Sequence, residues 1–100
     1  MFTYTFRFKK DGDLIYISHL DLLRLLSRAG RRADLPLALT QGFNPRVRIK
    51  LKKALKLGVA SDNEEGELVL FDRLDEKELK IRWQAELPPG LEIRELEVCT

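Results

Sequence analysis

The stretch FTYTFRFK at residues 2–9 alternates an aromatic side chain with a smaller or charged one at every second position. Side chains of a β-strand point to opposite faces with this same period. The pattern therefore predicts a strand with one buried face and one exposed face. The chain is expected to turn directly after it, at Asp11-Gly12-Asp13.

A helix is expected to begin after Ser18. Ser18 and Asp21 stand three residues apart, which is a capping-box pattern with Asp in the last position. Apolar residues then recur at helical spacing and predict a stripe that packs on the sheet. The stripe consists of Leu20, Leu23, Leu26 and Ala29 or Gly30, widened by Leu22 and Leu25. The arginines of this segment fall largely outside the stripe and are expected to face solvent: Arg24, Arg28, Arg31 and Arg32.

The same helix is expected to end near Ala33. The residue before a proline is pushed out of the α conformation, so the Leu35-Pro36 step stops the helix. Gly30 lies inside the helical pattern, where it either permits close packing on the sheet or marks an earlier end.

The middle of the chain predicts an additional hairpin. Leu37–Thr40 has the composition of a short strand, Gln41–Pro45 has turn chemistry, and Arg46–Leu51 alternates strictly. The alternation places Val47, Ile49 and Leu51 on one face of the second strand. The other face is a row of cations formed by Arg46, Arg48 and Lys50.

The C-terminal third predicts two strands around a helix. Ser61–Gly66 is expected to be a polar connection and Glu67–Phe71 a central strand. A second helix is expected from about Asp75 to Glu86, capped by Asp72 or Asp75, before Pro88-Pro89-Gly90 stops it. Its buried positions should be Leu79, Trp83 and Leu87. Leu91–Val98 should form the last strand, with a bulge near Arg94-Glu95 because its apolar positions change phase there.

The order strand, helix, hairpin, strand, helix, strand predicts an α+β fold. It matches the ferredoxin-like split βαβ sandwich, in which two helices cover one face of an antiparallel sheet. The hairpin near residues 37–51 is an addition to that plan. A chain of 100 residues has room for one hydrophobic core, so residues 1–100 are expected to form a single domain.

Composition limits the chemistry that the chain can perform alone. One cysteine, Cys99, and one histidine, His19, leave no intrachain disulfide and no conventional zinc site, and we expect no metal and no cofactor. No stretch is apolar enough to span a bilayer, and a cytoplasmic location is expected. Few Cys and Met beside many Lys, Glu, Arg and Leu is also typical of thermophiles.

The net charge of +2 hides a strong segregation along the chain. Residues 24–56 carry ten basic residues and one acidic residue, whereas residues 62–97 carry twelve acidic and five basic residues. The sequence is thus electrically bipolar, which favours a polyanionic partner for its middle third.

Four segments in this order resemble the radical SAM-linked proteins, bacterial domains of unknown function fused to or encoded beside radical SAM enzymes, often near a ribonuclease of the G type. The segments are Ile17–Arg24, Leu35–Ala38, Gln41–Pro45 and Leu57–Ser61. The resemblance runs from about Tyr4 to Pro89 and implies a radical SAM partner in RNA metabolism, without implying a reaction. The chain departs from the family pattern where Asp34 replaces a frequent Gly and Arg46-Val47 replaces a frequent His-Pro. Members often continue for about a hundred further residues, so this chain is also consistent with an N-terminal half.

RNA is the first hypothesis for the partner of the basic segment. The strand cations Arg46, Arg48 and Lys50 are spaced to follow a single-stranded backbone, and Phe43 can stack a base. The predicted binding residues also include the helix cations Arg28, Arg31 and Arg32 and the loop residues Gln41 and Asn44. Two alternatives remain open. The cations can form a solvated edge, or they can contact a protein, including the acidic third of a second copy in a homo-oligomer or adaptor.

His19 supports a second hypothesis. In the first helical turn it is placed to bind phosphate, or to act as the general acid or base of a metal-independent ribonuclease. The structural alternative is that Ser18 and Asp21 cap the helix while His19 bonds to a neighbouring loop. The sequence leaves open whether the basic faces of the helix and the strand meet.

Overall fold

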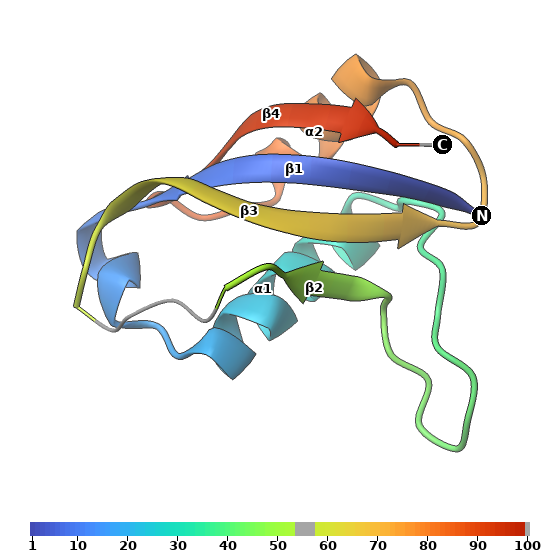
Figure 1. The fold of residues 1–100 in the computed structure, drawn as a ribbon, viewed down its shortest axis with the longest axis horizontal. Coiled ribbons are helices and arrows are strands. Elements are labelled where there is room, and N and C mark those ends of the chain that lie inside the picture. Colours follow the sequence, from blue (N-terminus) through green and yellow to red (C-terminus); the bar gives the residue numbers. More distant parts are fainter. Residues whose placement is uncertain (54–57, 100) are drawn as a thin grey trace.

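The computed structural model describes residues 1–53 and 58–99. It contains an antiparallel sheet of four strands in the order β2-β3-β1-β4. The elements along the chain are β1 (Phe2–Lys10), a 3-10 turn η1 (Gly12–Tyr16), α1 (His19–Arg32), β2 (Ile49–Leu51), β3 (Ser61–Leu70), α2 (Glu76–Ala85) and β4 (Leu91–Val98). Both helices pack on the same face of the sheet (Figure 1). The α+β, ferredoxin-like prediction is confirmed.

The alternating stretch at the N-terminus forms the centre of the sheet. β1 pairs with β3 on one side and with β4 on the other. Tyr4, Phe6 and Phe8 are at most 1% exposed and form one core with the buried residues of the two helices. Trp83 of α2 meets Phe6 edge-on, with ring centroids 4.9 Å apart. These three aromatic side chains therefore pack in the core between the sheet and the helices, and the opposite face of β1 carries small and charged residues.

β3 is longer than predicted, because Ser61–Gly66 belongs to the strand and is not a polar connection. β1 offers backbone partners over its whole length, with Phe8 opposite Glu64 and Lys10 opposite Ser61. Backbone pairing does not require apolar side chains, so the polar composition was misleading here. The bulge in β4 is confirmed, since Phe8 and Arg7 face Ile93 and Glu95 and leave Arg94 as the extra residue.

α1 begins and ends where the sequence predicts, and its four buried residues all belong to the predicted stripe. Ser18 caps it by accepting a hydrogen bond of 3.1 Å from the backbone N–H of Asp21. The buried positions are Leu22, Leu26, Ala29 and Gly30, whereas Leu20 is 52% exposed. The segment has leucines on several sides, so periodicity alone did not show that Leu20 lies outside the buried stripe. A Cβ at Gly30 would lie 3.3 Å from Leu37, which explains the glycine as a point of close packing.

The predicted strand at Leu37–Thr40 is reduced to isolated bridges, from Leu37 to Leu70 and from Leu39 to Val47. β2 is correspondingly shorter than the predicted Arg46–Leu51 strand. The backbone of Ala38 bonds to two different segments: its N–H donates to the carbonyl of Val69, and its carbonyl accepts from the N–H of Arg48. The segment therefore does not pair continuously with a single strand. The additional hairpin is present as a loop whose neck is closed by hydrogen bonds between Thr40 and Arg46.

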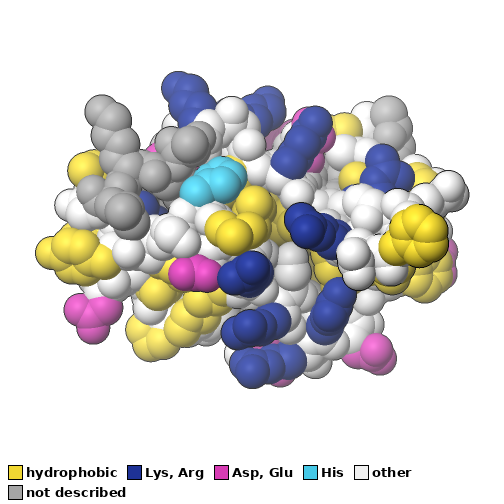
Figure 2. Space-filling view, turned by 90° about the horizontal axis from the view of Figure 1, so that it is seen from below, with side chains coloured by type: hydrophobic (Ala, Val, Ile, Leu, Met, Phe, Trp, Pro, Cys, Tyr) yellow, Lys and Arg dark blue, Asp and Glu magenta, His cyan; other side chains and the backbone are white. Residues whose placement is uncertain are grey.

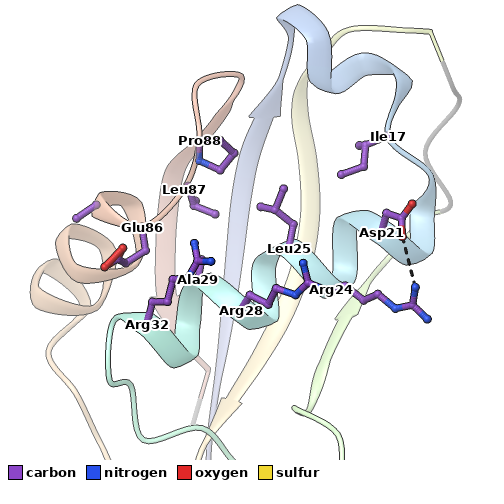
Figure 3. Close-up of a pocket in the computed structure, with 11 residues that line it drawn as sticks. Ile17, Asp21, Arg24, Leu25, Arg28, Ala29, Arg32, Glu86, Leu87 and Pro88 are labelled. Carbon is purple, nitrogen blue, oxygen red and sulfur yellow. Dashed lines mark ion pairs between the residues drawn. The ribbon is translucent and has the colours of Figure 1, made fainter.

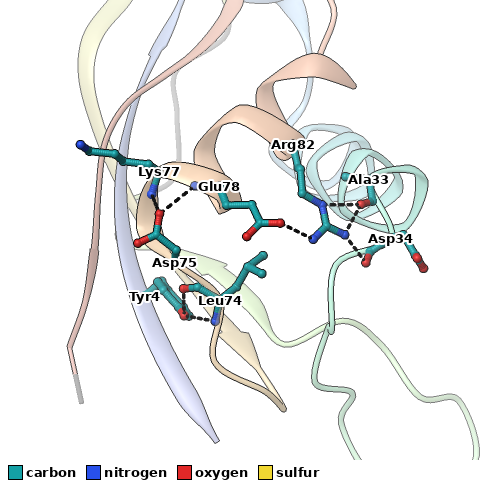
Figure 4. Close-up of polar contacts among 8 residues, drawn as sticks. All are labelled: Tyr4, Ala33, Asp34, Leu74, Asp75, Lys77, Glu78 and Arg82. Carbon is teal, nitrogen blue, oxygen red and sulfur yellow. Dashed lines mark hydrogen bonds and ion pairs between the residues drawn. The ribbon is translucent and has the colours of Figure 1, made fainter.

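Of the two predicted caps of α2, the structure shows Asp75, and Leu79 and Trp83 are buried as predicted, whereas Leu87 follows the helix and is partly buried. The carboxylate of Asp75 accepts hydrogen bonds from the N–H groups of Lys77 and Glu78 (Figure 4). The Tyr4 hydroxyl bonds to both the N–H and the carbonyl of Leu74, so the entry to α2 is tied to β1. No helix in the described ranges is long and apolar enough to cross a membrane.

The C-terminus of α1 predicts a stabilising substitution at Asp34. Asp34 has φ +55°, while Arg82 donates to its carbonyl and to that of Ala33 (Figure 4). Asp34→Gly should raise the free energy of unfolding by about 0.5–1 kcal/mol, because glycine adopts this conformation without steric cost. Urea denaturation measures the change. Ala33→Gly, at φ −75°, should destabilise and serves as control, and an Asp34→Gly protein no more stable than wild type would contradict the explanation.

Candidate nucleic-acid interface

The exposed side of α1 is an arginine ridge. Arg24, Arg28 and Arg31 lie four and three residues apart, so they follow one another along the helix, and Arg32 flanks them. Lys and Arg side chains gather on the face of the molecule shown in Figure 2, which lies below the sheet in the view of Figure 1. A groove runs along each side of this ridge.

The first groove, named here the arginine groove, lies between α1 and residues 45–49 and has a volume of about 500 Å³. Arg24, Arg28 and Arg31 line it from the helix, and Arg46 lines it from the other segment. Its remaining lining residues are Leu20, Leu23, Ser27, Pro45, Val47 and Ile49. The exposure of Leu20, unexpected for a core residue, is explained because Leu20 belongs to this groove.

The arginine groove is not neutralised by the protein itself. No carboxylate lines it. Among the four arginines of the groove, Arg24 alone has an ion-pair partner within residues 1–53 and 58–99, namely Asp21 at 3.5 Å. The other three form no ion pair there: Arg28, Arg31 and Arg46. Guanidinium groups are always charged, so their positive potential is available to an anion from outside.

The open face of the sheet shows the opposite arrangement. Arg7 pairs with Glu65 at 3.2 Å and with Glu95 at 3.6 Å, and Lys52 pairs with Glu65. The hydrogen bond from Lys52, followed by its charge, lowers the pKa of Glu65, and the same contact raises the pKa of Lys52. This face is thus a network of opposite charges that satisfy one another, which leaves it poorly suited to a polyanion.

The second groove, on the other side of the ridge, has a volume of about 530 Å³ (Figure 3). Arg24 and Arg28 line it as well, together with Arg32 and with the segment that leaves α2. Two carboxylates, Asp21 and Glu86, also line this groove. It is therefore less electropositive than the arginine groove.

The structure brings only part of the predicted basic segment together. Arg28, Arg31 and Arg46 meet in the arginine groove, and Arg32 lies in the second groove. Arg48 and Lys50 line neither. Lys50 instead pairs with Glu67 at 3.4 Å on the open face of the sheet. Arg46 and Lys50 therefore do not share one groove, and ligand binding by Arg48 and Lys50 stays a prediction.

Arg24 lines the arginine groove and is missing from the predicted binding residues. Its spacing to Arg28 and Arg31 was the available signal. Residues that are three and four positions apart lie on the same side of a helix, so Arg24 shares its side with Arg28 and Arg31. Periodicity could have found it.

The loop residues and His19 lie outside both grooves. Gln41, Phe43 and Asn44 are exposed at the tip of the loop between Thr40 and Arg46. His19 is half-buried, and its Nδ1 atom has no hydrogen-bond partner among the described residues. Within the described residues, Nδ1 of His19 therefore does not make the hydrogen bond expected to a neighbouring loop.

A protein-family model matches residues 3–100, nearly the whole chain. Its description is "Uncharacterized protein conserved in bacteria (DUF2344)". No curated protein matches the chain. The description names no ligand, reaction or partner.

Proposed function

This chain belongs to that uncharacterised bacterial family, and we propose that it is a non-catalytic accessory domain that binds RNA in the arginine groove. One observation carries the proposal. Four arginines from two separate segments converge on one groove that no carboxylate lines. Like charges repel, so such a cluster costs stability unless an anion occupies it.

The kind of cation favours phosphate as the anion. All four are arginines, whose planar guanidinium presents paired N–H donors that match a phosphate oxygen pair. The three helix arginines are spaced by about 6 and 4.5 Å along the axis of α1. A linear row of this kind suits a chain of phosphates better than one compact anion. The apolar lining residues, such as Leu20 and Leu23, can contact sugar or base surfaces beside the phosphates.

The partner enzyme is a further part of the proposal. The resemblance to radical SAM-linked proteins supports a radical SAM enzyme as the protein to which the bound RNA is presented. The geometry gives less support to a ribonuclease that uses His19, because His19 does not line the arginine groove. Self-association between the basic and acidic thirds remains an alternative that sedimentation at several salt concentrations can separate from RNA binding.

The test is the salt dependence of RNA binding. Each phosphate contact to single-stranded nucleic acid contributes a slope of about −0.7 to a plot of log affinity against log salt. Three to four contacts predict a slope of about −2 to −3, or about a 30-fold loss of affinity from about 50 to 200 mM KCl. Fluorescence anisotropy with a labelled RNA of about twelve nucleotides measures it. No binding, or binding that salt leaves unchanged, would reject the proposal.

A further inference from the structure

Phe43 lies at the tip of the loop between Thr40 and Arg46, beside the arginine groove. Its side chain is 104% exposed relative to the reference value, so it makes essentially no contact with the rest of the described chain. The loop extends away from the body of the molecule in Figure 1, between the end of α1 and β2. Phe6 and Phe8, in contrast, are buried in the core. A fully exposed phenyl ring contributes nothing to folding and keeps both of its faces free.

The loop is held at its base and connected directly to the groove. The N–H of Thr40 donates to the carbonyl of Arg46 over 2.8 Å, and the N–H of Arg46 donates to the Thr40 hydroxyl over 3.0 Å. Pro45 and Arg46, which end the loop, both line the arginine groove. Phe43 precedes Arg46 by three residues, so the two Cα atoms are within about 11 Å of each other. If Arg46 binds a phosphate, the base of a neighbouring nucleotide can therefore reach Phe43.

We infer that Phe43 stacks on an unpaired base of the RNA whose phosphates occupy the arginine groove, which makes the preferred ligand single-stranded. The inference rests on the proposed function. In a duplex both faces of each internal base are already covered by its neighbours, so an exposed aromatic side chain gains a stacking partner only from an unpaired base. An exposed ring of this kind can also insert into a pocket of a partner protein. The arginines without ion-pair partners in the adjacent groove favour a polyanion instead.

Three ligands test the inference: a single-stranded RNA of about twelve nucleotides, the duplex of the same sequence, and inorganic polyphosphate, which has charge without bases. Wild type should prefer the single strand. Phe43→Ala should lose about tenfold in affinity for single-stranded RNA and keep its affinity for polyphosphate. Phe43→Trp should retain RNA binding, and its new indole should be quenched by single-stranded RNA but not by polyphosphate. Phe71→Ala is the matched control, because Phe71 is an exposed aromatic outside the loop.

The outcomes separate the two proposals. If wild type binds RNA with the expected salt dependence but Phe43→Ala binds it equally well, base stacking is wrong and RNA binding stands; the ring is then free for a protein contact. If Phe43→Ala weakens polyphosphate as much as RNA, the loop shapes the groove and does not stack a base. If wild type binds none of the three ligands, both proposals fail.

Discussion

Replacing Arg28, Arg31 and Arg46 together with alanine is expected to weaken RNA binding about 100-fold at about 50 mM salt. The three guanidinium groups line the arginine groove and have no ion-pair partner within residues 1–53 and 58–99. Each therefore contributes its charge to the ligand without first breaking an internal contact. The slope of log affinity against log salt should also become less negative by about 2, since about three phosphate contacts are lost.

A second triple variant shows whether position or total charge matters. Lys50→Ala/Arg73→Ala/Arg94→Ala removes the same number of positive charges from exposed residues, none of which lines either groove. We expect this control to bind RNA within about threefold of wild type. Anisotropy with the same labelled RNA measures both variants. An equal loss in both would mean that net charge alone drives association, and the arginine groove would then not be the site.

Trp83→Ala is expected to lower the free energy of unfolding by about 3–5 kcal/mol. Trp83 is fully buried, packs edge-on against Phe6 of β1, and donates a hydrogen bond of 3.1 Å to the carbonyl of Leu26 in α1. One side chain thus links both helices to the central strand. Small domains have about 5–15 kcal/mol of stability in total, so the variant should lose about a fifth of it or more.

Urea unfolding followed by circular dichroism measures this loss, because the variant has no tryptophan fluorescence. Trp83→Phe keeps a buried ring but loses the hydrogen bond, and an intermediate loss of about 1–2 kcal/mol is expected. Ile81→Ala is the control on the same helix, since Ile81 is 69% exposed and should change stability by less than about 0.5 kcal/mol. Comparable losses in Trp83→Ala and Ile81→Ala would contradict the described packing of α2.

Much of the fold follows from patterns within short segments. The strand at the N-terminus, the cap of α1 at Ser18, the cap of α2 at Asp75 and the bulge at Arg94 are all as predicted. Each of these features depends on residues that are close in sequence, such as a hydroxyl three positions before an N–H group. Their physical cause is therefore visible in the sequence.

The errors have a different origin. Leu20 was wrongly placed in the buried stripe of α1, because the helix has leucines on several sides and packing against Leu37 and the sheet selects among them. The beginning of β3 was missed because its polar residues are ordered by backbone pairing with β1. In both cases the deciding partner is a separate segment of the chain.

The basic middle third, the cationic side of α1 and the two-layer α+β sandwich all follow from patterns along the chain. Which cations lie side by side depends on the packing of separate segments. The tertiary structure places Arg46 across a groove from Arg24, Arg28 and Arg31, and it leaves Lys50 paired with Glu67 on the open face. The physical reason is that charge is a property of single residues, whereas a groove forms only when segments some fifteen residues or more apart pack beside each other.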